Sequence, residues 1–182
     1  MMRQSFIAGM LVSIAVALQT FLTSGPSATV AAAEFEPAAF EPGQIDARSL
    51  TALVAKSRVV LVDVRTAEEF AVSRIKGAVR ADQTTEQDVL IRRLGARIPG
   101  AVVVLYCTLG PRSVGFGINA QDALTTAGAK AVLTLTGGLI AWVNAGLPLV
   151  DAKGPTRFVH PSDQATSQHL SDPTRARFEP RR

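Results

Sequence analysis

The sequence predicts an α/β fold in which a mainly parallel sheet is covered by helices on both faces. Segments with the pattern of strands alternate with segments with the pattern of helices between residues 45 and 150, an order typical of consecutive βαβ units. Two of the strand segments, VVLVDV and AVVVLY, are almost entirely apolar, as strands buried on both faces are. Hydrophobic residues make up 47% of the 182 residues, so one domain can bury a substantial core.

Each element rests on its own local pattern. Leu50 and Leu53 recur at helical spacing in the first helix. Thr66 followed three residues later by Glu69 is a capping box, and we interpret Glu68 and Glu69 as a helix start rather than as an acid–base pair. The expected elements are helix 49–57, strand 58–64, helix 66–70, strand 77–80, helix 84–94, strand 101–106, helix 113–128, strand 130–135, the turn 136–138, helix 139–146 and the exit 147–150.

The first 33 residues have the layout of a secretory signal peptide. An apolar run at residues 6–22 follows a start with one arginine, and Ala31 and Ala33 fit a cleavage site before Glu34. The alternative is an uncleaved anchor, with residues 6–22 in the membrane and the domain facing the periplasm, although polar side chains within the run weaken a span. We expect a periplasmic or secreted protein, with no stable membrane span once the signal is cleaved.

The segments that flank the domain are expected to hold little regular structure. Residues 34–44 are interrupted by prolines and predict a surface linker before the domain at residues 45–150. Residues 151–182 combine four prolines with Ser, Thr, Asp and Arg, a composition that predicts a disordered C-terminal tail. Its two histidines, His160 and His169, are nine residues apart, and we interpret them as solvated side chains rather than metal ligands.

The charge distribution argues against a nucleic-acid partner. Residues 34–150 carry 12 basic and 11 acidic side chains, a net charge of +1, and residues 151–182 carry 6 and 4, a net charge of +2. A protein that binds a duplex needs a basic face that neutralises several phosphates. Binding of nucleic acid is therefore not expected.

The stretch CTLGPRS, residues 107–113, contains the only cysteine of the chain. Cys107 follows an apolar strand, and the loop that ends at Arg112 leads into a predicted helix, whose free N–H groups and dipole stabilise negative charge. A thiolate or a bound anion is favoured there, whereas an unpaired cysteine is otherwise commonly a small buried side chain. We interpret Cys107 as reactive.

A second group of polar residues follows the neighbouring apolar strand. Asp63 and Arg65 end VVLVDVR, as Cys107 follows VVVLY. The carboxyl ends of parallel strands lie at one edge of a sheet. If the two strands are neighbours, both groups meet at that edge.

Three stretches in chain order carry a family resemblance. VLVDVRTAEEFAVSRIKGAVR is similar to a D-x-R-x-x-x-E-F element followed by G-H-I-x-G-A, CTLGPRS to a C-x-x-G-x-R loop followed by Ser, and LTGGLIAWVNAGLPL to L-x-G-G-x-x-x-W-x-x-x-G-x-P. In this order, over residues 45–150, they resemble the rhodanese-like sulfurtransferases. The resemblance implies a three-layer rhodanese-like domain with a mainly parallel sheet of about five strands flanked by helices.

The resemblance also implies sulfur transfer, with no metal and no organic cofactor. Cys107 would take a sulfane sulfur from thiosulfate or a persulfide donor and hold it as a persulfide, and a thiol, cyanide or a protein sulfur acceptor would remove it. Asp63 and Arg65 would support the edge of the site, and Arg112 would brace the loop or meet the donor. The loop that would cradle the sulfur consists of Thr108, Leu109, Gly110, Pro111, Arg112 and Ser113.

The sequence departs from the family pattern at three places. Ser73 and Arg74 replace the Gly-His pair, a change that affects a turn more than the chemistry. Thr108 and Leu109 stand where many members that use thiosulfate carry a basic residue, and Pro111 removes one N–H group from the loop. The last two changes weaken capture of a dianion, so we expect a persulfide or polysulfide donor.

Two other functions stay open at this point. Cysteine phosphatases also use a thiolate in a loop closed by arginine, but their C-x5-R loop is one residue longer than the loop from Cys107 to Arg112. A sulfur-carrier or binding module would use Cys107 without multiple turnovers. The sequence does not separate such a carrier from an enzyme.

Overall fold

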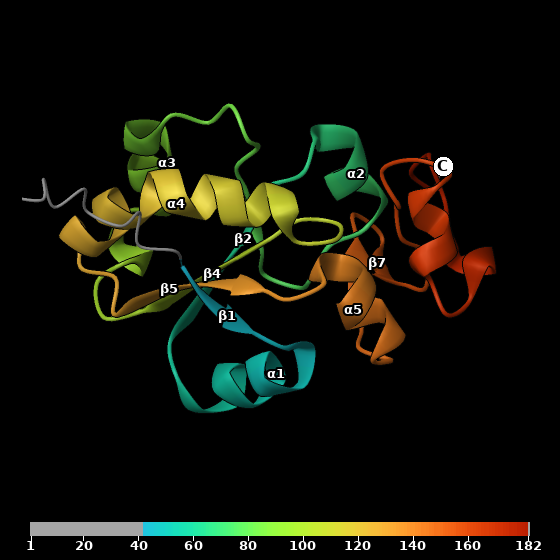
Figure 1. Ribbon diagram of the computed structural model, residues 1–182, viewed down its shortest axis with the longest axis horizontal. Helices are drawn as coiled ribbons and strands as arrows, with labels where there is room; N and C mark the ends of the chain where they lie inside the picture. Colours follow the sequence, from blue (N-terminus) through green and yellow to red (C-terminus); the bar gives the residue numbers. More distant parts are fainter. Residues whose placement is uncertain (1–41, 182) are drawn as a thin grey trace, which may run out of the picture. The chain divides into compact units, whose positions relative to one another are not determined.

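The computed structural model describes residues 42–181. The expected signal peptide, its cleavage site and most of the expected linker lie outside these residues. The described chain contains a five-stranded sheet in the order β1-β5-β4-β2-β3, in which every neighbouring pair is parallel (Figure 1). The predicted parallel α/β fold is therefore confirmed. The strands are β1 (Gly43–Ile45), β2 (Val59–Asp63), β3 (Val79–Arg80), β4 (Val102–Tyr106) and β5 (Ala131–Leu135).

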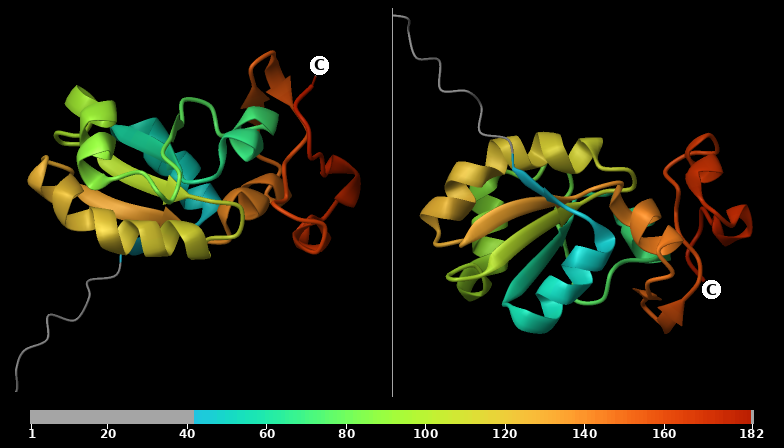
Figure 2. Two further views of the ribbon diagram at one scale, coloured as in Figure 1. Left: turned by 90° about the horizontal axis from the view of Figure 1, so that it is seen from above. Right: turned by 60° about the horizontal axis from the view of Figure 1, so that its bottom comes forward.

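Helices cover both faces of the sheet, as Figures 1 and 2 show. Side chains of β4 alternate between two hydrophobic clusters: Val103 and Leu105 pack on the side of α3 and α4, and Val104 and Tyr106 on the side of α1 and α5. This burial on both faces explains why the strand is continuously apolar. The helices are α1 (Ala47–Lys56), α2 (Ala67–Val72), α3 (Gln87–Leu94), α4 (Pro111–Thr126) and α5 (Gly138–Asn144).

Two elements at the ends of the predicted domain were not predicted. Residues 43–45, which overlap the expected linker, form the edge strand β1 and pair with β5. A segment of three residues has no periodicity that a sequence pattern could reveal. At the other end, the expected exit leads into β6 (Leu149–Asp151), which pairs with β7 (Gly154–Thr156) as an antiparallel hairpin.

Residues 151–181, for which the composition predicted a disordered tail, contain regular elements in the structure. After β7, residues 157–181, here called the C-terminal segment, form two short 3-10 helices at Thr166–His169 and Pro173–Arg175. Val159 and Leu170 are buried in the cluster that contains α5. The composition predicted disorder because the segment builds no core of its own. Its few apolar side chains instead complete the core of the domain.

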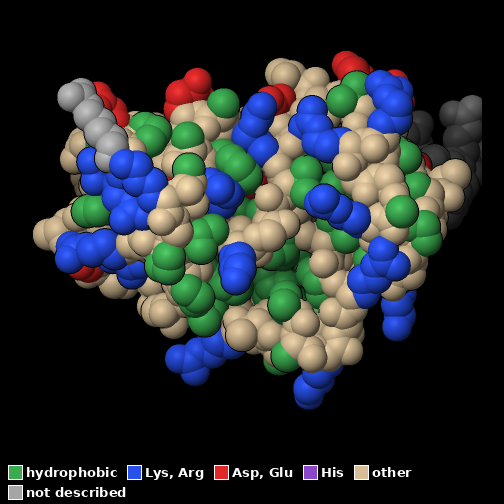
Figure 3. Space-filling model, turned by 180° about the vertical axis from the view of Figure 1, so that it is seen from behind, with side chains coloured by type: hydrophobic (Ala, Val, Ile, Leu, Met, Phe, Trp, Pro, Cys, Tyr) green, Lys and Arg blue, Asp and Glu red, His purple; other side chains and the backbone are tan. Residues whose placement is uncertain are grey.

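Length and apolar character decide whether a helix of the described chain can span a membrane. Among residues 42–181, every helix is too short or too polar to cross a bilayer. On the face shown in Figure 3, Lys and Arg side chains are scattered among apolar and neutral groups rather than gathered into one tract.

Candidate active site

The site lies where β2 and β4 end side by side. The two strands are paired in parallel, with Asp63 opposite Tyr106, and Cys107 is the next residue of the chain. The expectation that these two strand ends meet at one edge of the sheet is confirmed. The topology thus brings together Asp63, Arg65 and the loop that begins at Cys107.

The thiol of Cys107 is enclosed by its own loop. The residue is 1% exposed, and the backbone N–H of Gly110 donates a hydrogen bond to its Sγ at 3.0 Å. The Ser113 hydroxyl oxygen lies farther from the sulfur, at 3.9 Å. An N–H group directed at sulfur stabilises a thiolate more than a neutral thiol. The loop therefore supports negative charge on this atom.

The turn into α4 determines which amides of the loop face the sulfur. Gly110 has a φ of +121°, a backbone conformation that residues other than glycine rarely adopt. Pro111 occupies the first turn of α4, where its missing N–H is tolerated. The Ser113 N–H instead donates to the Gly110 carbonyl oxygen at 3.0 Å, and its hydroxyl does so at 2.7 Å. Of these two amides, that of Gly110 serves the thiol and that of Ser113 closes the turn.

The N-terminus of α5 is attached to the same loop. The Leu139 N–H donates to the Cys107 carbonyl oxygen at 2.8 Å, and the Ile140 N–H donates to that of Thr108 at 3.1 Å. Gly138 makes this approach possible, because a Cβ there would lie 2.5 Å from the Cys107 carbonyl oxygen. The expected tight turn at Gly137 and Gly138 is confirmed, and its tightness positions the loop.

Arg112 is held by Glu69 in a bidentate ion pair. Its Nη1 and Nη2 lie 2.9 and 2.7 Å from the Glu69 carboxylate oxygens, and the two side chains are 27% and 4% exposed. Burial alone would raise the pKa of Glu69, but hydrogen bonds from Arg112, Ser162 and the Thr66 N–H hold it well below its usual range. The Glu69 carboxylate is therefore charged at neutral pH and compensates the charge of Arg112.

Arg112 nevertheless contacts the residue after Cys107, because its Nη2 donates to the Thr108 hydroxyl at 2.8 Å. The pKa of Arg112 is raised, first by its hydrogen bonds with Glu69, and Cys107 contributes in the same direction. Arg112 thus acts as a brace between the loop and α2, with its charge compensated beside the sulfur.

Leu109, the loop residue between Thr108 and Gly110, packs its side chain against the cluster on the side of α1 and α5.

Two hydroxyl groups surround this ion pair. The Thr108 and Ser162 hydroxyls are 2.7 Å apart, and each bonds both to Glu69 and to Arg112 Nη2. Ser162 belongs to the C-terminal segment, and its N–H donates to the Nδ1 of His160 at 3.0 Å. The segment expected to be a tail therefore contributes to the site.

Asp63 and Arg65 form a separate, fully buried ion pair. Both side chains are 0% exposed, and Arg65 Nε and Nη2 lie 2.9 and 2.7 Å from the two Asp63 oxygens. Arg65 Nη2 also donates to the Ser73 carbonyl oxygen at 2.6 Å. The pair fixes the chain between β2 and α2, next to the loop.

Three residues of the site were missed by the sequence analysis: Glu69, Ser162 and His160. The capping box at Thr66 is confirmed, since both of its hydrogen bonds are present, but the same Glu69 carboxylate also reaches Arg112. Its place in the D-x-R-x-x-x-E-F element was a signal that could have found it. Ser162 and His160 had no signal, because their place depends on how the C-terminal segment packs.

Neither histidine belongs to a metal site in the described part of the chain. Residues 42–181 contain no group of three or more His, Cys, Asp or Glu side chains arranged to hold an ion. His160 is 9% exposed rather than solvated as expected, and its ring packs edge-on against Phe178 at 5.2 Å. His169 is exposed.

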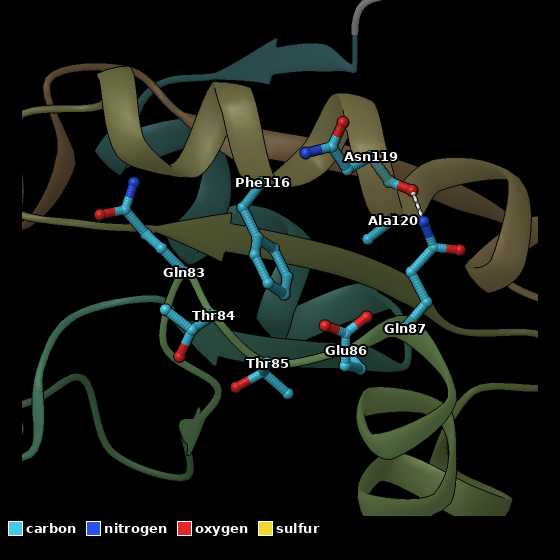
Figure 4. A pocket seen from close by; sticks show the side chains of 8 residues that line it. All are labelled: Gln83, Thr84, Thr85, Glu86, Gln87, Phe116, Asn119 and Ala120. Carbon is cyan, nitrogen blue, oxygen red and sulfur yellow. Dashed lines mark hydrogen bonds between the residues drawn. The ribbon is translucent and has the colours of Figure 1, made fainter.

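A separate polar cavity of about 260 Å³ lies between the loop after β3 and helix α4. Figure 4 shows Phe116 projecting from α4 into it, with polar side chains around the ring. Gln87 reaches across to the backbone oxygen of Asn119. The cavity contains no cysteine or histidine, and its lining is Gln83, Thr84, Thr85, Glu86, Gln87, Phe116, Asn119 and Ala120.

Known proteins are similar to this chain over most of the part that holds the three motifs. A family model described as the rhodanese-like domain covers residues 46–145. A protein of Allochromatium vinosum named sulfurtransferase is 37% identical over 113 residues, which are 61% of this chain and 97% of that protein. A Synechocystis protein, named only as uncharacterized, is 36% identical over 58% of this chain. This chain spans 55% of the length of that relative.

One solved structure supports the fold. A thiosulfate sulfurtransferase of Pseudomonas aeruginosa superposes with a TM-score of 0.50 at 24% identity. The match covers 70% of this chain and 23% of that one. At this identity, the likeness shows a shared fold.

Proposed function

The chain belongs to the rhodanese-like domain family, and from this premise we propose that it is a sulfurtransferase that carries a sulfane sulfur on Cys107. One observation carries the proposal: the Cys107 Sγ accepts the Gly110 N–H at 3.0 Å inside a loop that leads into α4. A sulfur atom placed so is stabilised as a thiolate nucleophile. The relative named sulfurtransferase supports the same chemistry.

The proposed reaction has two steps. In the first, the Cys107 thiolate attacks the outer sulfur of a donor persulfide; an S–S bond forms to Cys107, the donor S–S bond breaks, and the donor leaves as a thiolate. In the second, an acceptor thiolate or cyanide attacks the outer sulfur on Cys107, and the Cys107 thiolate leaves. The Gly110 N–H stabilises the thiolate before the first step and after the second.

We infer that the donor is a persulfide or polysulfide rather than thiosulfate. Arg112, the cation beside the thiol, is compensated by Glu69. Thr108 and Leu109 add no charge to the loop, and Pro111 provides no N–H group. A thiosulfate dianion would therefore meet little uncompensated positive charge. A persulfide needs less positive charge at the site, since its transferable sulfur carries at most one negative charge.

Mass spectrometry of the single cysteine tests the proposal. Purified, reduced protein is incubated with glutathione persulfide or with thiosulfate, and the peptide that contains Cys107 is expected to gain about 32 Da, the mass of one sulfur. Subsequent addition of cyanide should release thiocyanate and remove the gain. Cys107→Ala is the control. Folded wild-type protein that gains no mass from either donor would contradict the proposal.

Turnover separates an enzyme from a carrier. Repeated formation of thiocyanate in excess of the protein, absent in Cys107→Ala, is expected for an enzyme. A single equivalent would instead support the carrier, with a protein as sulfur acceptor. A higher rate with thiosulfate than with glutathione persulfide would contradict the inferred donor.

We also propose that the protein is exported. The support is the pattern of residues 1–33, which resembles a cleaved signal peptide. N-terminal sequencing of native protein from separated cell fractions is the test, and Glu34 is the expected first residue. Protein recovered from the cytosol with Met1 intact would contradict export.

A further inference from the structure

Ser162 stands out because its backbone is strained at the place where its side chain reaches the site. It is the only non-glycine residue with a positive φ, +75°, among residues 42–181. Such a conformation is unfavourable for residues other than glycine and persists where the surrounding structure enforces it. Strain of this kind is concentrated at functional sites. The hydroxyl of Ser162 bonds both Arg112 and Glu69, the ion pair of the site.

The hydroxyl contacts both members of that pair. Ser162 Oγ accepts from Arg112 Nη2 at 2.9 Å and donates to the Oε1 of Glu69. It therefore lies at the end of the ion pair where Arg112 Nη2 and Glu69 Oε1 meet at 2.7 Å. Loss of the hydroxyl removes an acceptor from the arginine and a donor from the carboxylate at the same time.

The C-terminal segment is fixed firmly enough to place this hydroxyl. Val159 pairs with the chain around Ala176 and is buried with Leu170 beside α5. The Asn144 side chain bonds the His169 carbonyl oxygen and the Ser171 N–H. Because α5 is itself bonded to the carbonyl oxygen of Cys107, the segment and the loop share one support.

We propose that Ser162 is a positioning and specificity-determining residue of the site. It keeps Arg112 on Glu69, so that the positive charge beside Cys107 stays compensated, and it thereby disfavours anionic donors such as thiosulfate relative to persulfides. The consequence for donors rests on the proposed function. The effect on charge beside the thiol does not, and it is measurable without any sulfur transfer.

Alkylation of the single thiol by two reagents measures that charge. Iodoacetate and iodoacetamide react with a thiolate by the same displacement of iodide, but only iodoacetate carries a negative charge. The ratio of their rate constants cancels changes in thiolate fraction and in exposure, which affect both reagents. A less compensated Arg112 raises the ratio of the iodoacetate rate to the iodoacetamide rate.

Three variants of the full-length protein are compared with wild type. Ser162→Gly removes the hydroxyl and relieves the strained φ. We expect it to raise the ratio of the iodoacetate rate to the iodoacetamide rate about threefold or more, because the charge of Arg112 is then less compensated. Glu69→Gln keeps a capping-box side chain and should raise the ratio further. Ser171→Gly is the matched control, an exposed serine of the same segment whose hydroxyl has no bond to the loop, and should leave the ratio unchanged.

The donor preference is measured on the same proteins. In Ser162→Gly, kcat/KM for thiosulfate should rise relative to that for glutathione persulfide, mainly through a lower KM for thiosulfate. Equal alkylation ratios in Ser162→Gly and Ser171→Gly would overturn the proposal, as would a thiol that reacts with neither reagent in any folded variant. Raised ratios in a protein that transfers no sulfur would refute the proposed function and leave the role of Ser162 in charge compensation standing.

Discussion

The backbone N–H of Leu139 donates a hydrogen bond to the carbonyl oxygen of Cys107 at 2.8 Å. This bond fixes the first turn of α5 to the residue that carries the thiol. The contact requires that Gly138, just before Leu139, pass close to the loop with a φ of +57°. The shape of the loop therefore depends on a glycine that is distant in the sequence.

Gly138→Ala should disturb the loop as well as the stability of the domain. A Cβ at this position would lie 2.5 and 2.6 Å from the carbonyl oxygens of Cys107 and Thr108, and its positive φ adds strain. We expect the free energy of unfolding to fall by about 2–4 kcal/mol, measured by urea denaturation. The rate of Cys107 alkylation should change with it, because the carbonyls that hold the loop are displaced.

Gly146→Ala is the matched control for that substitution. Gly146 also has a positive φ, +75°, but a Cβ there would meet nothing within 4 Å. Gly146→Ala should lower the free energy of unfolding only by the cost of the backbone conformation, about 1–2 kcal/mol. It should leave the rate of Cys107 alkylation unchanged. Equal effects of the two substitutions would show that close packing on the loop is unimportant.

Asp63→Asn should destabilise the domain strongly. Asp63 and Arg65 are both fully buried, and the substitution leaves the Arg65 charge without a counterion. Breaking a buried pair in this way costs about 3–5 kcal/mol. Asp88→Asn is the control, since its partner Arg92 lies with it at the surface at 67% and 65% exposure, and such pairs contribute about 1 kcal/mol or less. A difference below about 1 kcal/mol between the two variants in urea denaturation would contradict the assigned role.

What the sequence could predict was local. The apolar runs of β2 and β4, the capping box at Thr66 and the turn into α4 at Gly110 each depend on neighbouring residues, and each is present in the structure. The short strand β1 could not be predicted, because it is held by its pairing with β5 rather than by any pattern of its own.

The candidate site was predictable only along the loop. Arg112 was recognised by its spacing from Cys107, but its partner Glu69 is 43 residues away, and the local pattern already explained that glutamate as a helix cap. Ser162 lies 50 residues from Arg112 in a segment whose composition is typical of disorder. Its place depends on the packing of Val159 and Leu170 against α5, which no local pattern encodes.

Leu170→Ala tests whether the C-terminal segment is a structural part of the domain. Leu170 is 4% exposed and packs in the cluster beside α5. Its truncation should cost about 2–4 kcal/mol of unfolding free energy, whereas Gln168→Ala, at an exposed position of the same segment, should cost less than about 0.5 kcal/mol. Urea denaturation of both variants is the measurement. Equal stabilities would indicate that the segment is undocked in solution.

The packing of His160 makes the stability of the protein depend on pH. The pKa of His160 is lowered, first by burial; the nearby Glu69 opposes this shift, and Arg65 and Arg112 add to it. The folded protein therefore binds the proton less readily than the unfolded chain, whose histidines titrate near about pH 6.5. The contribution to stability is complete above that pH and is lost as the pH falls from there toward the lower pKa of the folded state.

The geometry gives the same sign, because His160 Nδ1 accepts the N–H of Ser162 and a protonated imidazole has no free acceptor. We expect the unfolding free energy to fall as the pH is lowered from about 7.5 to about 5, and His160→Gln to remove part of that slope. The exposed His169→Gln variant should retain that slope and is the control. Urea denaturation at several pH values measures the difference. If the two variants show the same slope, the assigned contribution of His160 and its bond with the Ser162 N–H to the pH dependence of stability is refuted.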